Sequence, residues 1–336
     1  MHESLSARRL NAPAGEYHLT GAFFMSLTLV EAAKLHATNG ETKRAAVISM
    51  FAQQSDLLMA MPFKNIPGNA YSYNREGVLP GVAFRGINES YTESTGVINP
   101  QTEALRIAGG DLDVDMAILK TQGESVRATH EAMKAKALAA ELTRVLIKGD
   151  STSQPREFDG LQVRLTGGQL IAAGATSGGD ALSLLKLDEL TDAVSGPNKY
   201  LIMNKAMRRR LTAAGRTTAV SGYLTHTLDA FGRQLTAYNG IPILVPYSEN
   251  DGTDPIAFDE VGSGGGAAVT TSIYCASFAD GYVCGIQNGV MDVRDLGEVQ
   301  SQPVKRTRVE WLAGLVIEHG RAAARLYGIT NAAVVA

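Results

Sequence analysis

The sequence predicts an α+β protein, and three observations carry that prediction. Residues 121–148 place apolar side chains every three to four positions, the period of a helix that buries one face. From Ala70 onward apolar and polar residues alternate, as they do in strands exposed on one side. Near the end of the chain, Val309, Trp311, Ala313, Leu315 and Ile317 alternate with a second, largely apolar set, which suits a strand covered on both faces.

Two short helices are expected before the first strands, at about 26–37 and 42–61. Pro62 ends the second helix, and Gly40 separates the two. The apolar run from Gly21 to Val30 is too short to span a bilayer, and we expect no membrane partner. We interpret these helices as parts of an extended arm over residues 1–64, not as the start of a compact domain.

A β-hairpin is predicted next. The stretches "AYSYNRE" (70–76) and "GVAFRGI" (81–87) alternate, and "GVLPG" joins them. Neither strand has enough large apolar residues to form a buried face of its own. Because a lone two-stranded ribbon is marginally stable in water, this hairpin needs a neighbour to lie on.

The long helix is the strongest element in the sequence. Strands are expected before it, at 103–119. Thr121 and Glu124 fit a capping box at its start, and Gly149 follows its last turn. A helix of this length forms a rod of roughly 40 Å, at about 1.5 Å per residue.

The rest of the chain mixes short elements. Loops and turns are expected over 151–182. A helix at about 183–195, a strand at 199–203 and a helix at 205–215 follow. Residues 216–295 are expected to form mostly strands and loops, with "GSGGG" at 262–266 as a hairpin tip.

Composition limits the function. The chain has 31 basic and 34 acidic residues, which argues against an electrostatic nucleic-acid binder. Its 35 glycines within a 45% hydrophobic sequence indicate many turns in a β-containing protein. Cys275 and Cys284 have neither metal-type spacing nor a disulfide framework, so we expect buried thiols in a reducing cytosol.

Motifs that carry chemistry are missing or incomplete. The sequence contains no Gly-x-Ser-x-Gly and no Walker motif. "GSGGGA" (262–267) fits a dinucleotide-binding pattern, but β-branched residues follow where a helix would have to begin. His130-Glu131 begins a zinc-protease pattern, but Lys134 stands where the second histidine is needed.

Two charged clusters could in principle serve as sites. Asp111, Asp113 and Asp115 fall on one strand face and could hold a cation, but a solvated face or a charged edge is the better interpretation. The run Arg208–Arg210 could meet phosphate, but a solvated helical face or ion pairing is the more common role. We therefore predict no catalytic residue, no cofactor and no metal.

The order of these parts resembles the major capsid proteins of tailed bacteriophages, which share the HK97-like fold. "EGVLPGVAFRGINESYTESTG" is similar to the family's extended hairpin, the E-loop. "FDGL" (158–161), "NGIPILV" (239–245) and "TRVEWLAGLVIEHGRAAARLYGITNA" (307–332) are also similar to capsid segments. The resemblance covers nearly the whole chain.

The resemblance implies a domain organisation. Residues 1–64 would be the N-terminal arm and 65–105 the E-loop. Residues 106–197 and 292–336 would form the peripheral domain, with the spine helix at about 121–148. Residues 198–291 would form the axial α/β domain, which meets its copies around five-fold and six-fold axes.

It also implies how copies meet. The hairpin would find its missing core on a neighbouring subunit, and five charged residues would pair across that contact: Arg75, Glu76, Arg85, Glu89 and Glu93. Some family members link an E-loop lysine covalently to a neighbour's asparagine. Because this chain has no lysine between Lys64 and Lys120, we expect a non-covalent shell.

The function implied is that of a structural protein of an icosahedral phage head that encloses double-stranded DNA. Its partners would be other copies, portal and separate scaffolding proteins, possible cement proteins, and DNA through weak non-specific contacts. Its location would be the virion, after assembly in the host bacterial cytoplasm. Two alternatives stay open: an encapsulin-type nanocompartment shell, and an α/β enzyme with a hairpin lid.

Overall fold

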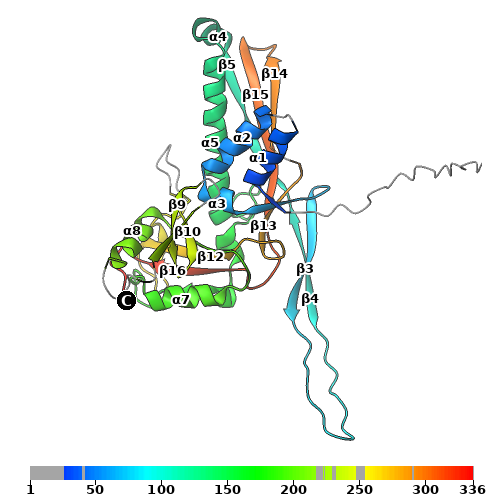
Figure 1. The fold of residues 1–336 in the computed structure, drawn as a ribbon, viewed down its shortest axis with the longest axis vertical. Helices are drawn as coiled ribbons and strands as arrows, with labels where there is room; N and C mark the ends of the chain where they lie inside the picture. Colours follow the sequence, from blue (N-terminus) through cyan, green and yellow to red (C-terminus); the bar gives the residue numbers. More distant parts are fainter. Residues whose placement is uncertain are drawn as a thin grey trace, which may run out of the picture.

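The structure is a computed structural model that describes residues 26–39, 42–216, 222, 224–228, 232–246, 254–289 and 291–335. Figure 1 shows three parts: a long rod, a rounded body beside its lower end, and a two-stranded ribbon that projects away from the rod. Helices and strands both contribute to the rod and to the body, which confirms the α+β class. Within the described residues, no helix is both long enough and apolar enough to cross a membrane.

The first helices belong to the main core. Strand β1 (Leu27–Thr28) leads into α1 (Leu29–Thr38), where Thr28 and Glu31 form a capping box. The predicted second helix is two helices, α2 (Thr42–Gln53) and α3 (Asp56–Ala60), because the backbone is extended at Ser55. Strand β2 (Pro62–Asn65) follows.

Large side chains of this region are fully buried, Phe51 and Phe63 among them. They share one hydrophobic cluster with the long helix and the C-terminal strands. The expectation of an extended arm is therefore wrong for residues 26–39 and 42–64, because their apolar faces pack against distant parts of the chain.

The ribbon differs in its pairing from the predicted hairpin. Strand β3 (Ala70–Val78) pairs antiparallel with β4 (Val97–Ala104), and these two strands form a sheet of their own. The stretch 81–87, predicted as the second strand, lies in the long loop between them. Alternation in "GVAFRGI" therefore does not reflect a strand.

The rod begins with β5 (Arg106–Asp115), α4 (Met116–Gln122) and α5 (Ser125–Lys148). The predicted capping box is wrong: Thr121 lies in the last turn of α4, where its Oγ1 donates to the Ala117 carbonyl. Gly123, with a φ of 88°, separates the two helices. The 24 residues of α5 span about 36 Å at 1.5 Å per residue.

Gly149 ends α5 as predicted. Its backbone N–H donates to the Val145 carbonyl, 2.8 Å away. A Cβ at this position would lie 2.4 Å from the Phe158 carbonyl oxygen, so no larger residue fits. Because the chain after the helix passes so close to residue 149, this position requires a glycine.

A six-stranded sheet runs from the rod into the core. Strand β15 (Val304–Ile317) is its axis and pairs with β13 (Val283–Gln287), β14 (Asp292–Glu298) and β5. Trp311 on β15 is 1% exposed, with its ring 5.4 Å from that of Phe51 and 5.0 Å from that of Phe63. Its indole N–H donates to Gln287, 3.1 Å away.

The rounded body is built on a second, eight-stranded sheet. Its path is β6-β16-β12-β7-β10-β9-β8, with β11 paired to β12. The strands are β6 (Leu170–Ala172), β7 (Lys199–Ile202), β8 (Leu224–Leu228), β9 (Gln234–Tyr238), β10 (Ile241–Leu244), β11 (Glu260–Val261), β12 (Ala268–Ser277) and β16 (Ala323–Ile329). The remaining helices are α6 (Leu161–Arg164), the 3₁₀ turn η1 (Gly167–Gln169), α7 (Leu184–Ala193) and α8 (Lys205–Ala214).

Several sequence predictions hold in this part of the chain. The 262–266 stretch turns between β11 and β12, as expected of a hairpin tip. The C-terminal strands are largely buried, and β15 is buried at every position from Ala313 to Ile317. Cys275 and Cys284 are buried thiols, and burial raises the pKa of each to about 12.

The predicted domain boundaries stay a prediction. Two strands pair across them. Strand β13 falls in the predicted axial segment but pairs with β15 of the rod. Strand β16 falls in the predicted peripheral segment but pairs with β12 of the body. The two sheets therefore exchange strands across both boundaries.

Candidate functional site

The three aspartates considered for a cation are already engaged. Asp111 accepts from Arg308 at 2.6 Å and Asp113 accepts from Arg306 at 2.6 Å, both on the outer face of the rod. Asp115 caps α4 by accepting from the Ala117 backbone N–H, 2.7 Å away. These carboxylates are ion-pair partners and a helix cap, and they do not converge on a common point.

These pairs predict acid sensitivity in the rod. Hydrogen bonds from Arg308 and Arg306 hold the pKa values of Asp111 and Asp113 below their usual 3.8. A carboxylate with a depressed pKa stabilises the fold above pH 3.8, and this contribution is lost as pH falls through the depressed value. We expect the Asp111→Asn, Asp113→Asn double variant to lose thermal stability more slowly than the native protein between pH 5 and pH 2.

Hydrogen exchange of β5 at several pH values is the local measurement for this prediction. Asp192→Asn, at an exposed position on α7, is the matched control. An acid response of the double variant identical to that of the native protein would contradict the prediction.

One group of described side chains has metal-type proximity. Ligand atoms of Asp280, Cys284 and Glu318 lie within 4.8 Å of one another. The ammonium of Lys64 lies 3.2 Å from the Asp280 carboxylate and 3.6 Å from that of Glu318. The Lys64 ammonium therefore already pairs with two of these three groups.

The arginine run does not form a single site. Arg210 donates to the side chain and the carbonyl of Asn331. Arg208 lines a hollow of about 250 Å³ with Lys205, Arg233 and Asp56. Arg233 already pairs with Asp56 at 3.1 Å. Of the three arginines, Arg208 thus lines a hollow, Arg210 contacts a loop and Arg209 is exposed.

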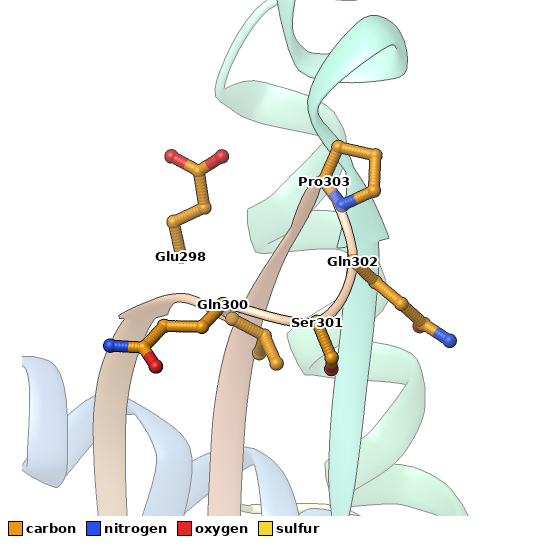
Figure 2. A pocket seen from close by; sticks show the side chains of 6 residues that line it. Glu298, Gln300, Ser301, Gln302 and Pro303 are labelled. Carbon is orange, nitrogen blue, oxygen red and sulfur yellow. The ribbon is translucent and has the colours of Figure 1, made fainter.

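The end of the rod carries a larger but open hollow of about 410 Å³, formed by residues 298–303 between β14 and β15. Figure 2 shows that Glu298, Gln300 and Gln302 point in different directions. No polar groups converge there, so this hollow offers no chemistry.

The tip of the ribbon carries an exposed apolar surface. This tip, residues 79–96, extends far from the body (Figure 1). Val82, Phe84 and Ile87 are 95%, 105% and 94% exposed, so this tip presents three large apolar side chains entirely to solvent. Leu79 and Tyr91 on the same tip are also exposed. A cluster of exposed apolar side chains marks an interaction surface.

Solved structures share this fold. A gene-transfer-agent structure, "Capsid of empty GTA particle", has a TM-score of 0.57 and 15% identity, and the match covers 82% of this chain and 90% of that chain. The structure from Mycobacterium phage Adephagia has a TM-score of 0.58 and 11% identity, and the match covers 82% of this chain and 90% of that chain. The holo-SrpI encapsulin of Synechococcus elongatus has a TM-score of 0.56 and 18% identity, and the match covers 83% of this chain and 89% of that chain.

A family model adds a second line of evidence. Residues 39–187, which include the ribbon and α5, match the family of the major capsid protein GP7. This match covers less than half of the chain, and the solved structures show that the chain has the HK97-like fold. A comparison with curated protein sequences gives no match. In this fold the ribbon with its tip corresponds to the predicted E-loop, and α5 corresponds to the predicted spine helix.

Three of the five charged residues predicted to pair between capsid subunits have partners in their own chain. Arg75 donates to the Ile317 carbonyl at 2.6 Å, and Arg85 donates to the Glu89 carbonyl at 3.0 Å. Glu89 in turn accepts from the Gly86 backbone N–H at 2.7 Å. Glu76 and Glu93 are exposed. The pairing of these residues between copies stays a prediction.

Sequence reasoning missed the apolar anchors of the E-loop. The alternation in residues 81–87 predicts a strand, not an exposed apolar tip. The signal that could have identified them is the absence of a covering face: nothing in the surrounding glycine-rich sequence can bury these side chains.

Proposed function

We propose that this chain is a major capsid protein that assembles, without covalent links, into a closed icosahedral phage head that encloses double-stranded DNA. The observation that carries the proposal is the E-loop tip, whose apolar side chains have no core of their own. Burial of a large apolar side chain stabilises a contact by about 1.5–3 kcal/mol. A neighbouring copy supplies the missing surface, and repetition of this contact closes the shell.

We propose a shell without covalent links because of where the lysines lie in the sequence. No lysine occurs between Lys64 and Lys120, and Lys64 lies at the root of the E-loop in contact with Tyr71 and Asp280. Shells dissolved in hot detergent are therefore expected to run as single chains on a denaturing gel. Ladders of linked chains would contradict this part of the proposal.

The weak contact with DNA rests on charge. With 31 basic against 34 acidic residues, the chain as a whole lacks the surplus that holds phosphates tightly. The protein then serves as a wall and carries out no reaction. By its family we further propose portal, scaffolding and cement proteins as partners, and assembly in the cytoplasm of the bacterial host.

The size of the expressed protein tests the proposal. Light scattering and negative-stain microscopy of the chain produced alone are expected to show closed shells, or pentamers and hexamers. A monomer of about 36 kDa that crowding agents and salt leave unchanged would contradict it.

The content of the particles distinguishes the phage head from the encapsulin-type shell. The second reading stays an alternative because the Synechococcus encapsulin has a similar fold. Nuclease-protected double-stranded DNA in particles made during infection supports the head. Particles that hold co-purifying enzymes and no DNA would favour the nanocompartment.

A further inference from the structure

The E-loop leaves the body through a small root with its own apolar contacts. Ile66, before β3, and Leu105, directly after β4, are buried there with Cys284, Ile286 and Val316. The Leu105 backbone N–H donates to the Asn69 carbonyl at 2.8 Å and closes the ribbon at this end. Outward from the root the ribbon is mostly exposed, so the root carries the contacts that can set its direction.

A chain of polar contacts crosses this root. Lys64 on β2 donates to the Tyr71 hydroxyl at 2.9 Å, and that hydroxyl donates to the Glu318 carboxylate at 2.9 Å. Lys64 also contacts Asp280 at 3.2 Å. The contacts therefore join the start of the ribbon, the strand before it and the segment after β15.

These charges are shielded from water. The Lys64 and Glu318 side chains are only 13% and 15% exposed. Burial lowers the pKa of Lys64, but the hydrogen bond with Tyr71, the charge of Glu318 and the contact with Asp280 outweigh it and raise the pKa above its ordinary value. The ammonium thus stays charged, and its bonds are of the charge-assisted kind.

Two further ties hold the ribbon, one from each strand. Arg75 on β3 donates to the Ile317 carbonyl, and Glu103 on β4 forms a two-point ion pair with Arg164. Neither contact lies at the point where β2 turns into β3. The Lys64–Tyr71–Glu318 contacts lie at that point, because Lys64 and Tyr71 flank the turn between them.

We propose that Lys64, Tyr71 and Glu318 form a lock that fixes the angle at which the E-loop leaves the body, and through it the curvature of the shell. This inference rests on the proposed function, since the angle matters only where the E-loop reaches a second copy. The three are positioning residues, which decide where the apolar tip arrives. A shell closes at a single size only if each copy presents its tip at a defined angle.

Tyr71→Phe is the sharpest test, because it keeps the ring and removes only the hydroxyl that links Lys64 to Glu318. Hydrogen exchange in the unassembled protein should rise about tenfold in 71–78 and 97–104, the effect expected of losing one charge-assisted hydrogen bond. Exchange in α5 should not change. Shells of this variant should form but vary in diameter more widely than those of the native protein.

Lys64→Met and Lys64→Arg extend the test. The methionine variant should behave like Tyr71→Phe, and the arginine variant should restore much of the native protection because it keeps the charge. Lys186→Met, which breaks an exposed ion pair on α7, is the matched control.

Ribbon exchange and shell diameters indistinguishable from the control would overturn the lock. If the native protein itself formed no shells, the proposed function would fail. The exchange measurement on unassembled protein would still decide whether the lock holds the ribbon.

Discussion

Replacing Val82, Phe84 and Ile87 by serine is expected to abolish shell formation and to leave the monomer folded. These side chains are almost entirely exposed in the single chain, so their removal costs the fold little. In the shell each would bury its apolar surface, and together they would contribute roughly 5–9 kcal/mol per contact. A loss of that size weakens each contact more than a thousandfold. Light scattering measures assembly, and circular dichroism confirms the fold.

A charge variant of the same loop tests the alternative that charged residues, not apolar ones, hold the contact between copies. Glu89→Gln with Glu93→Gln removes two of the residues predicted to pair between copies and leaves the apolar tip intact. We expect this variant to assemble, with a changed rate and salt dependence, because such charges affect register and encounter more than affinity. If the charge variant failed to assemble and the serine variant succeeded, the E-loop would act through its charges.

Trp311→Ala is expected to lower the free energy of unfolding by about 3–5 kcal/mol. The indole lies between Phe51 and Phe63, so its removal leaves a cavity where the N-terminal helices meet the rod. The substitution also removes the partner of the buried Gln287 side chain. Urea unfolding of the unassembled protein measures the loss.

Leu185→Ala on α7 is the control for this variant, because Leu185 is 75% exposed and its removal should change stability little. Trp311→Phe should fall between the two, since it keeps an aromatic ring but loses the indole N–H. A Trp311→Ala variant as stable as the control would show that the N-terminal helices do not depend on this contact.

Elements stabilised by their own residues could be predicted from the sequence. The helix α5 has a repeating apolar face and a required glycine at its end, and both signals are local. The start of α5 could not be predicted, because the capping pattern at Thr121 competes with a helix break at Gly123. A glycine in a left-handed conformation overrides a capping pattern, and nothing in the sequence reveals that conformation.

Contacts between distant residues account for the other errors. Phe51 packs against Trp311, 260 positions later, so the sequence shows that the N-terminal helices are amphipathic but not what they cover. The true partner of β3 is "VINPQTEA", which is exposed at nearly every position and carries Pro100. Because neither face of this strand is buried, backbone pairing alone specifies it, and no hydrophobic pattern marks it.

For the candidate site, the sequence predicts the segment but not which of its side chains lie exposed. Sequence reasoning identified residues 65–105 as the interacting segment, because that segment lacks a core. It also predicts that charges such as Arg85 and Glu89 pair between copies. These two residues contact each other within the loop, and their pairing between copies stays a prediction. The side chains without a partner in the chain's own core are the apolar ones, and their exposure becomes visible only once the fold is known.

The register of β5 on β15 has a mechanical consequence. Ten consecutive residue pairs, from Val304 with Asp115 to Ala313 with Arg106, join the two antiparallel strands along the rod. Tension along the rod would pull these strands past each other, which loads all of their hydrogen bonds at once, in shear. Tension across the rod would peel the pairs apart one at a time, at a much smaller force. A wall that swells from within is therefore strongest where its rods lie along the direction of stretch.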